Sequence, residues 1–357
     1  MAKKYQLVYE DLKEQMRAGT LLDGDRIPSE TEMMEHYAVS RQTIRQALEM
    51  LEKEGRIEKI RGSGSYVRNL RNVETKRIAV IAYYINSSVF PKTLSAIESF
   101  LFEKGYTTML FSTMGRVERE RKIFKQLYND AVDGIILHAT KSTLLCVDVD
   151  LLLKIHNRGT KIVFMDNYYP NEEFASVPRV AMEDYAGAYE ITRRLIQDGH
   201  RNIGGVFASE EVQIRDRLNG VRKAVVDADV LYNDDNFITF GRVNDLGYKL
   251  KTCEGEILKL DAFICASGSS SAQVAEFMKV RGRGNIRTII IFDEVEFPKI
   301  EGLNVIMLKH ASEEIGSTCA EKILALLRGE NVTSSRFPWT MADGRKIPED
   351  RDKRMGR

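Results

Sequence analysis

The sequence predicts a mixed α/β chain with a small N-terminal domain of short helices and a β-hairpin, followed by a larger two-lobed α/β domain. The first prediction rests on two capped helical segments and a glycine-rich hairpin near the N-terminus. The second rests on apolar runs of strand length that alternate with helical patterns from residue 78 to residue 327. A chain of 357 residues is long enough for two or three domains with cores of their own.

Two short helices joined by a tight turn are predicted near the N-terminus. Ser29 and Glu32 have the spacing of a capping box, and Pro28 prevents the first helix from starting earlier. Ser40 is suited to cap the second helix, because its hydroxyl can accept a hydrogen bond from an unpaired backbone N–H of the first turn.

The second of these helices has one apolar face and one polar face. Ile44, Leu48 and Leu51 recur at helical spacing and form the predicted buried stripe. The side chains that then point outward are Arg41, Gln42, Arg45 and Gln46. This pattern is typical of a helix-turn-helix whose second helix enters the major groove of DNA with its N-terminus first. The alternative is a pair of surface helices with solvated arginines.

A β-hairpin is predicted directly after the second helix. Residues 56–60 and 66–67 alternate polar and apolar side chains on either side of the turn 61–65, where Gly64 would let the tip approach another surface. The basic side chains beside the tip are Lys59, Arg61 and Arg68. A hairpin in this position is a wing, so residues 1–68 are predicted to form a winged helix-turn-helix.

Charge in this domain is segregated. Residues 1–39 carry five Lys/Arg against eight Asp/Glu, whereas residues 40–70 carry seven against four. The positive charge therefore lies on the helix and hairpin that would face phosphate, as electrostatic docking on DNA requires.

The larger domain is predicted to consist of two doubly wound halves. Residues 69–77 are polar and charged and are predicted to be a linker. Predicted strands are 78–85, 107–112, 132–137, 161–166, 202–207, 236–240, 262–265, 288–292 and 304–308. Predicted helices are 94–104, 117–129, 151–157, 187–197, 218–227, 247–258, 272–279 and 314–327. A second series of strands and helices begins near Val180, so residues 78–341 should form two lobes with a ligand cleft beyond the carboxyl ends of the strands. The charged tail 342–357 is expected to be disordered.

Several classes of protein are disfavoured by what the sequence lacks. The four cysteines and five histidines are scattered, which predicts neither a disulfide framework nor a bound metal, and no cofactor is expected. The first residues have no apolar signal-peptide core and no run reaches membrane-spanning length, so a cytoplasmic protein is expected. A GxSxG elbow, a Walker motif and a GxGxxG after the first strand are all missing, which argues against an enzyme.

Residues 5–67 resemble the winged helix-turn-helix of GntR-type bacterial transcription regulators. The resemblance rests on the segments 24–30, 39–48 and 62–67, together with Tyr5, Leu12 and Met16. It implies that Arg41 and Arg45 contact phosphates or guanine edges, that Ser40 and Thr43 hold the backbone, and that Gly64 enters the minor groove. The DNA-binding residues expected on this basis are Ser29, Glu30, Thr31, Ser40, Arg41, Gln42, Thr43, Arg45, Arg61, Ser63 and Gly64. Some relatives have an arginine where this chain has Thr31, so that contact differs here.

Residues 77–341 resemble the periplasmic-binding-protein-like (type I) effector domain of LacI-type regulators. The matching segments are 78–81, 103–106, 132–137, 183–188, 198–203, 217–221 and 291–294. A GntR-type head on a LacI-type effector domain is the layout of the arabinose repressors of Gram-positive bacteria, and residues 205–220 are particularly similar to theirs.

This second resemblance implies a sugar site between the lobes, with Arg217 and Asp293 as direct ligand holders. Charged side chains and an aromatic face are suited to sugar hydroxyls and the sugar ring. The effector-binding residues expected are Tyr83, Phe90, Asp166, Asp184, Gln213, Arg217, Arg242 and Asp293. Two departures from the LacI pattern are Ser267-Gly268 in place of Asn-Asp, and Arg242 in place of an aromatic residue. A second arginine would suit an acidic or phosphorylated sugar.

Taken together, these features predict a ligand-responsive transcription regulator, a repressor released from its operator by a small sugar such as L-arabinose. A homodimer would place two winged heads on a pseudo-palindromic DNA operator. The alternatives are an activator and a regulator that responds to a sugar acid or sugar phosphate. A sugar-binding transport receptor would fit the larger domain alone, but the winged head and the missing signal peptide argue against it.

Overall fold

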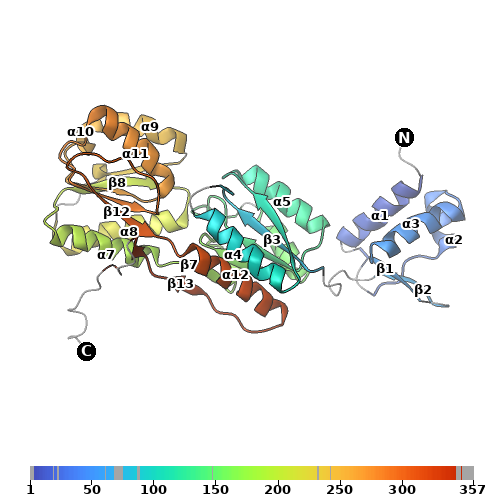
Figure 1. Ribbon diagram of the computed structural model, residues 1–357. Coiled ribbons are helices and arrows are strands. Elements are labelled where there is room, and N and C mark those ends of the chain that lie inside the picture. Colours follow the sequence, from blue (N-terminus) through green and yellow to red (C-terminus); the bar gives the residue numbers. More distant parts are fainter. Residues whose placement is uncertain are drawn as a thin grey trace.

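The computed structural model places three units in a row, with the N-terminal head at one end and the two lobes beside it (Figure 1). The structure describes residues 4–18, 20–21, 24–60, 62–67, 75–86, 89–146, 148–230, 233–241, 243–342 and 347. The predicted linker therefore lies largely outside the described residues, as does almost all of the predicted tail. No helix of the described segments is long and apolar enough to span a membrane.

The head contains the two predicted helices and the predicted two-stranded hairpin, together with a first helix that was not predicted. Its elements are α1 (Lys4–Ala18), α2 (Glu30–Tyr37), α3 (Arg41–Lys53), β1 (Ile57–Ile60) and β2 (Gly64–Val67). The Ser29–Glu32 capping box is present, and the hydroxyl of Ser40 accepts a hydrogen bond from the backbone N–H of Thr43 at 3.3 Å. Ile44, Leu48 and Leu51 are buried against α1 and the wing in a core of their own. The local signals in the sequence thus correctly predicted the helix starts and the buried stripe.

The lobe beside the head, here lobe 1, is a six-stranded parallel sheet in the order β13-β7-β6-β5-β3-β4. Its strands are β3 (Arg77–Ala82), β4 (Thr107–Ser112), β5 (Gly134–Leu137), β6 (Lys161–Met165), β7 (Arg179–Met182) and β13 (Ser335–Phe337). Its helices are α4 (Phe90–Glu103), α5 (Val117–Asn129), α6 (Val149–Asn157) and α12 (Ser312–Leu327), with the 3-10 turn η2 (Glu172–Phe174).

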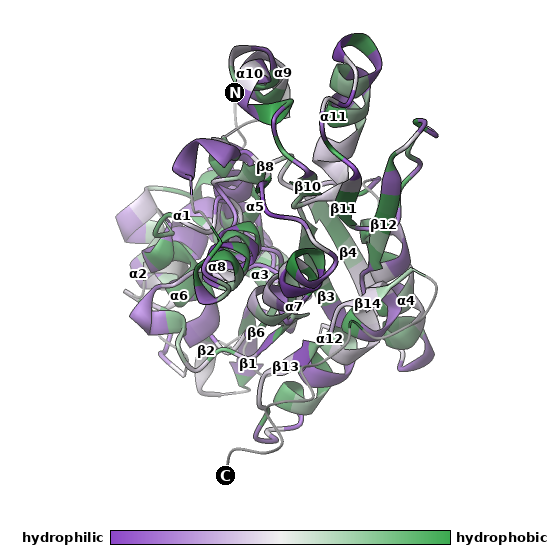
Figure 2. Cartoon of the chain, turned by 90° about the vertical axis from the view of Figure 1, so that its left-hand side faces the viewer, coloured by the Kyte–Doolittle hydropathy of each residue, from purple (hydrophilic) through white to green (hydrophobic). Residues whose placement is uncertain are grey.

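The far lobe, here lobe 2, has the strand order β14-β12-β11-β10-β8-β9, and only β14 runs antiparallel. Its strands are β8 (Ile203–Ala208), β9 (Phe237–Phe240), β10 (Ala262–Cys265), β11 (Thr288–Phe292), β12 (Asn304–Lys309) and β14 (Thr340–Met341). Its helices are α7 (Asp184–Gln197), α8 (Val212–Asp227), α9 (Val243–Thr252), α10 (Glu254–Ile257) and α11 (Gly268–Arg281), with the turn η3 (Asp234–Asn236). Strands such as β10 and β11 are buried along their whole length and mostly hydrophobic, as expected for strands covered on both faces (Figure 2).

The lobes are not two consecutive halves of the chain. The series that begins near Val180 starts with β7, which belongs to lobe 1, and the C-terminal α12 and β13 return to lobe 1 as well. The chain therefore crosses between the lobes three times, at Glu183, at residues 310–311 and at residues 338–339. The spacing of apolar residues indicates where a strand lies but not which strand it pairs with. The sequence therefore did not show that the chain passes back and forth between the lobes.

Some element boundaries also differ from those predicted. The strand predicted at 78–85 ends at Ala82, because the two tyrosines that follow turn out of the sheet. The helix predicted at 247–258 is broken at Cys253 into α9 and α10. The short strands β7, β13 and β14 were missed, since each has four residues or fewer and too little pattern to detect.

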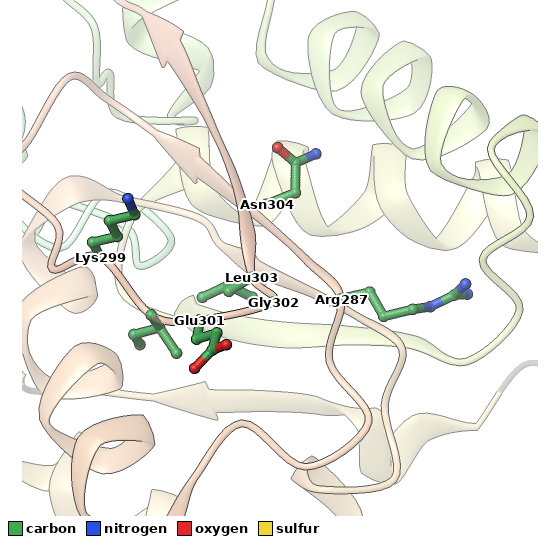
Figure 3. Close-up of a pocket in the computed structure, with 7 residues that line it drawn as sticks. Arg287, Lys299, Glu301, Gly302, Leu303 and Asn304 are labelled. Carbon is green, nitrogen blue, oxygen red and sulfur yellow. The ribbon is translucent and has the colours of Figure 1, made fainter.

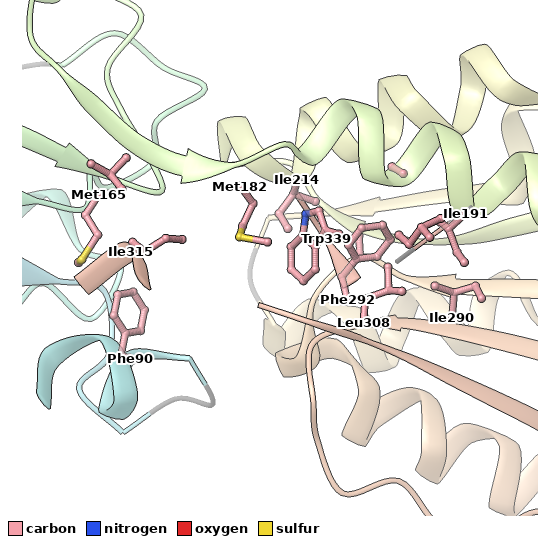
Figure 4. Packing of buried hydrophobic residues seen from close by; sticks show 14 of the residues in the cluster. Phe90, Met165, Met182, Ile191, Ile214, Ile290, Phe292, Leu308, Ile315 and Trp339 are labelled. Carbon is pink, nitrogen blue, oxygen red and sulfur yellow. The ribbon is translucent and has the colours of Figure 1, made fainter. Parts of the chain in front are cut away.

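One apolar cluster extends through both lobes and connects them. It includes Phe90, Met165 and Ile315 on the lobe 1 side and Phe292, Leu308 and Trp339 on the lobe 2 side (Figure 4). Two further clusters fill the outer faces of the two sheets. Trp339 on the third crossing belongs to the shared cluster and Ala311 on the second packs against it, so the lobes are joined through packed side chains as well as through the backbone.

The loop after β5 is held by a buried carboxylate. Glu120 on α5 is 2% exposed and accepts hydrogen bonds from the backbone N–H of Thr140, at 3.1 Å, and from the hydroxyl of Tyr169. Burial raises the pKa of Glu120 from 4.5 to about 7, although both hydrogen bonds oppose the shift. This loop contacts lobe 2, so the carboxylate holds a segment that bridges the two lobes.

We expect Glu120 to make the protein less stable as the pH rises from about 4.5 to about 7. A carboxyl whose pKa is raised by folding contributes stability below its unfolded pKa, and that stability is lost as the pH passes the folded pKa. At about 1.4 kcal/mol for each pH unit between the two pKa values, the loss is on the order of 3 kcal/mol. Glu120→Gln should flatten this part of the curve of melting temperature against pH.

Glu118 on the same helix serves as the control, because it is exposed. Glu118→Gln should leave the pH dependence of the melting temperature as in the wild type. If Glu120→Gln shows the full wild-type pH dependence, Glu120 is not the group that titrates.

Candidate functional site

The exposed face of α3 is the first candidate site. Arg41, Gln42 and Arg45 are exposed on its leading turns, as predicted from the buried stripe on the opposite face. Thr43 is half-buried, and its hydroxyl lies 2.9 Å from that of Ser40. The cap therefore occupies both hydroxyls in the absence of DNA, while the amide and the two guanidinium groups face outward.

Glu30 at the start of α2 contacts both arginines. Its carboxylate accepts hydrogen bonds from Nε of Arg45 at 2.9 and 3.2 Å and lies 3.6 Å from Nε of Arg41. These ion pairs are exposed and contribute little to stability. They do restrict where the two guanidinium groups can point, and they connect the first helix of the motif, α2, to its second helix, α3. Thr31, next to Glu30, is exposed.

The wing is stiffened at its tip and at its base. The hydroxyls of Ser63 and Tyr66 lie 2.6 Å apart, and Gly64 has a φ of 125°, a conformation that favours glycine. Arg26 forms a backbone bridge to Tyr66, and a side chain at Gly64 would come within 3.0 Å of its Nε atom. Arg26 is thus a basic side chain at the wing that the sequence analysis missed. Arg61 lies outside the described residues.

The second candidate site is the interlobe junction, where residues that follow the carboxyl ends of strands in both lobes contact one another. The Nζ atom of Lys141, after β5, lies 2.7 Å from Oε1 of Glu210, after β8. The backbone N–H of Val212 donates to the hydroxyl of Ser142 at 2.9 Å. Facing carboxyl ends are where ligands bind in such sheets.

Arg217 on α8 and Asp184 on α7 form a buried ion pair at this junction. The two side chains are 5% and 7% exposed, and Nε of Arg217 lies 2.7 Å from Oδ1 of Asp184. Nη1 of Arg217 donates to the backbone carbonyl of Ala266 at 2.5 Å. Burial raises the pKa of Asp184, and the guanidinium of Arg217 offsets part of the rise. Among the described residues Nη2 has no hydrogen-bond partner, so it can donate to another group.

Asp293 follows β11, and its side chain lies directly against Gly268. Its φ of 149° is costly for a residue with a side chain, and its Oδ1 atom accepts a hydrogen bond from the backbone N–H of Glu294 at 2.9 Å. A Cβ atom at position 268 would lie 2.9 Å from Cβ and Oδ2 of Asp293. This is a physical reason for the departure from the Asn-Asp pattern, because Gly268 leaves the room that Asp293 occupies.

Asp166 follows β6 and pairs with His310 across the lobes. Nε2 of His310 lies 3.3 Å from Oδ1 of Asp166, and its Nδ1 atom lies 2.9 Å from the hydroxyl of Ser312. Burial alone would lower the pKa of His310, but the facing carboxylate outweighs it and raises the pKa. Burial would likewise raise the pKa of Asp166, and the imidazole of His310 brings it below its ordinary value. His310 was missed by the sequence analysis, although its place after a predicted strand could have indicated it.

The predicted aromatic residues surround a buried histidine. Tyr83 and Phe90 meet the ring of His138 at centroid distances of 6.1 and 5.1 Å. Phe90 belongs to the shared apolar cluster, and Tyr83 packs against it. Burial lowers the pKa of His138, and its Nδ1 atom has no hydrogen-bond partner among the described residues.

Gln213 and Glu211 complete the contact between the lobes. The backbone N–H of Gln213 donates to Oδ1 of Asn167 at 3.4 Å, and its Nε2 atom donates to Oε2 of Glu211 at 2.9 Å. Of the eight effector-binding residues expected from the sequence, seven lie in the part of the chain that the structure describes, and Arg242 lies outside it. Trp339 was missed as well, since no pattern in the sequence marks it.

A pocket elsewhere on lobe 2 is separate from the junction. It lies at the amino ends of β11 and β12, and its lining includes Arg287, Lys299, Glu301 and Asn304 (Figure 3). The side chains of Arg287 and Lys299 point apart, so they do not form one binding surface. In the part of the chain that the structure describes, no three His, Cys, Asp or Glu side chains group in a way that could hold a metal ion.

Comparisons with known proteins match the head and the lobe region to two different families. Residues 4–67 match the family described as bacterial regulatory proteins of the gntR family. Residues 75–230 match the family of periplasmic binding proteins and the sugar-binding domain of the LacI family. The chain is thus a DNA-binding transcription regulator that joins a GntR-type head to a LacI-type sugar-binding domain.

Similar proteins include named transcription regulators. The chain is 27% identical to the arabinose metabolism transcriptional repressor of Geobacillus stearothermophilus over 92% of either chain. It is 30% identical to that of Halalkalibacterium halodurans over 67% of this chain and 65% of the relative. The crystal structure of the transcription regulator CcpA of Lactococcus lactis has the same fold, with a TM-score of 0.64 and 17% identity over 76% of this chain and 98% of that one.

We expect Gly268→Ala to destabilise lobe 2, because the added methyl group would lie 2.7 Å from Cγ1 of Val295 and 2.9 Å from Asp293. Overpacking of this kind costs about 1–3 kcal/mol, or several degrees in melting temperature. Gly255→Ala is the matched control, since a Cβ atom there would meet nothing within 4 Å. A Gly268→Ala protein as stable as the control would mean that Asp293 does not occupy the position described.

Proposed function

We propose that the chain is a repressor of genes for sugar use, and that a small neutral sugar of the L-arabinose kind releases it from its operator. The observation that carries the proposal is the similarity to an arabinose repressor over 92% of both chains, because it includes the head and the sugar-binding domain together. A similarity confined to one domain would not support a coupling between DNA binding by the head and sugar binding by the lobes.

On the DNA side, the exposed face of α3 would enter the major groove. Arg41, Gln42 and Arg45 have the side chains that donate to phosphates and base edges, and the wing would lie along the adjacent minor groove. Glu30 holds both guanidinium groups from one side, at 2.9 and 3.6 Å, so they would meet the DNA with their orientation already restricted. The remaining expected contacts are Ser29, Thr31, Ser40 and Thr43 on the helices and Ser63 and Gly64 in the wing, with Arg61 beside them in the sequence.

On the effector side, the charge of the junction supports a neutral ligand. The carboxylates described there are Asp166, Asp184, Glu210, Glu211 and Asp293, and the cationic groups are Lys141, Arg217 and His310. Carboxylates accept hydrogen bonds from hydroxyl groups but repel anions, whereas Nη2 of Arg217 could donate to a ring or hydroxyl oxygen. A neutral sugar fits this excess of acceptors better than a sugar acid or sugar phosphate does.

The domain division proposed with this function has a DNA-binding domain at 1–68, a linker at 69–77, an effector and dimerisation domain at 78–341, and a tail at 342–357. A homodimer would set two heads on a pseudo-palindromic operator. Lobe 1 offers exposed apolar side chains for such contact at Phe102, Leu110 and Met114, which are 73%, 43% and 45% exposed. Leu110 lies on the edge strand β4.

Release would follow from the hinge between the lobes. A sugar that holds the lobes together would bind the form with low DNA affinity better than the form with high DNA affinity, and the reverse effect follows by linkage. Coupling of about 1–3 kcal/mol corresponds to a change of about 5–150-fold in operator affinity. An activator would use the same parts, and the sign of the response decides between the two.

Arg45→Ala should weaken operator binding by about tenfold to a hundredfold, because it removes a donor to a base edge or phosphate. Sugar binding should not change, since Arg45 lies in the head. The DNA would be a fragment selected by the wild-type protein from random sequence, and affinity would be measured by fluorescence anisotropy at fixed salt. Lys53→Ala, at the other end of the same helix, is the control and should stay close to the wild type.

If Arg45→Ala binds the selected DNA as tightly as Lys53→Ala does, the face of α3 is not the DNA-binding surface. If it loses sugar binding as well, the division into two independent domains is wrong.

The effector would be identified by thermal melting against neutral pentoses and hexoses, sugar acids and sugar phosphates. A ligand at a hundred times its dissociation constant adds about 2.7 kcal/mol of stability. We expect L-arabinose or a near relative to raise the melting temperature and Arg217→Lys to abolish the rise. A rise with sugar acids or phosphates alone would contradict the neutral ligand and would point to Arg242.

A further inference from the structure

The three segments that connect the lobes meet at one side chain. The indole of Trp339, on the third crossing, donates from Nε1 to Oδ1 of Asp184 at 3.2 Å, and Asp184 directly follows the first crossing. Its ring meets that of His310, on the second crossing, edge-on at a centroid distance of 5.6 Å. Trp339 is 4% exposed and lies centrally in the shared apolar cluster (Figure 4).

The same ring covers the guanidinium of Arg217. The Cζ atom of Arg217 lies 4.7 Å from the centre of the Trp339 ring and 5.0 Å from that of Phe292, so two aromatic rings flank it. The rings of Phe292 and Trp339 themselves meet edge-on at 5.1 Å. A guanidinium held in this way by cation–π contacts cannot rotate without breaking them.

The backbone of α7 makes room for this arrangement. A Cβ atom at Gly187 would lie 2.6 Å from Cδ1 of Trp339, closer than atoms can approach. The indole therefore lies directly against the helix backbone, one turn after Asp184. Its position is determined from several sides: by Gly187, by the hydrogen bond to Asp184, and by the rings of Phe292 and His310.

We propose that Trp339 is a positioning residue for the effector site, which holds Arg217 and Asp184 in the orientation that binds the sugar and links that orientation to the hinge. This inference rests on the proposed function, in which Arg217 and Asp184 are part of the sugar site. The indole acts through these two side chains. Because all three crossings touch it, a change in the angle between the lobes must move the indole relative to at least one of them.

The test is the affinity for L-arabinose, measured by isothermal titration calorimetry on the full chain with the melting temperature of each variant recorded. Trp339→Phe keeps a ring over Arg217 but loses the hydrogen bond to Asp184, and we expect binding about tenfold weaker. Trp339→Leu loses both the ring and the hydrogen bond, and we expect L-arabinose to bind about a hundredfold more weakly. Phe337→Leu is the control, because it removes an aromatic ring from the end of β13, directly before the same crossing, but has no described contact with Arg217 or Asp184.

A purely structural role for Trp339 would lower the melting temperature without this order of affinities, so the two readouts separate the explanations. Equal affinities for Trp339→Phe, Phe337→Leu and the wild type would overturn the inference while leaving the proposed function intact. A wild-type protein that binds none of the sugars would overturn both.

The wild-type protein offers a second readout, since Trp339 is its only tryptophan. Saturating L-arabinose should change the intrinsic tryptophan emission, because the sugar would contact the two groups that surround the indole. Emission that is unchanged at saturation would contradict a position next to the occupied site.

Discussion

The buried ion pair between Arg217 and Asp184 is the interaction on which the rest of the junction depends. Two charges removed from water are tolerated only when other groups satisfy them. Here the carbonyl of Ala266, the indole of Trp339 and the ring of Phe292 supply those contacts. The need to satisfy this pair brings together α7, α8 and the ends of β10 and β11, which come from separate parts of lobe 2.

This pair also explains how a site for a small ligand can affect a distant DNA-binding head. Asp184 directly follows the first crossing, and its hydrogen-bond partner Trp339 lies on the third, so a ligand that contacts Arg217 or Asp184 would act beside the hinge. On the lobe 1 side, the pair of Asp166 and His310 and the contact of Lys141 with Glu210 join the lobes again. The head is attached to lobe 1, so in the proposed homodimer a rotation of lobe 1 relative to lobe 2 would move the head.

Much of the architecture could be predicted because it depends on short-range patterns. The capping box at Ser29, the cap at Ser40 and the stripe of Ile44, Leu48 and Leu51 are encoded within a few residues of one another, and all are present. Helix 117–129 and strands 107–112, 262–265 and 288–292 have the predicted bounds, since each is a clear run of one period. The short strands β7, β13 and β14, of two to four residues, could not be found, because none of them has the uninterrupted apolar run that marks a four-residue strand such as β10.

By itself, the sequence determined the winged head, the alternation of strand and helix, and the polar residues that follow the strands, because these features come from local spacing and capping. Only the tertiary structure decided which of those residues meet. Trp339 contacts Asp184 from 155 positions away, and His310 contacts Asp166 from 144 positions away. Both contacts exist because α12, β13 and β14 thread back through the lobes. Contacts between residues so far apart in the sequence depend on how whole sheets pack and on how buried charges are paired. The local spacing of polar and apolar residues contains no information about either.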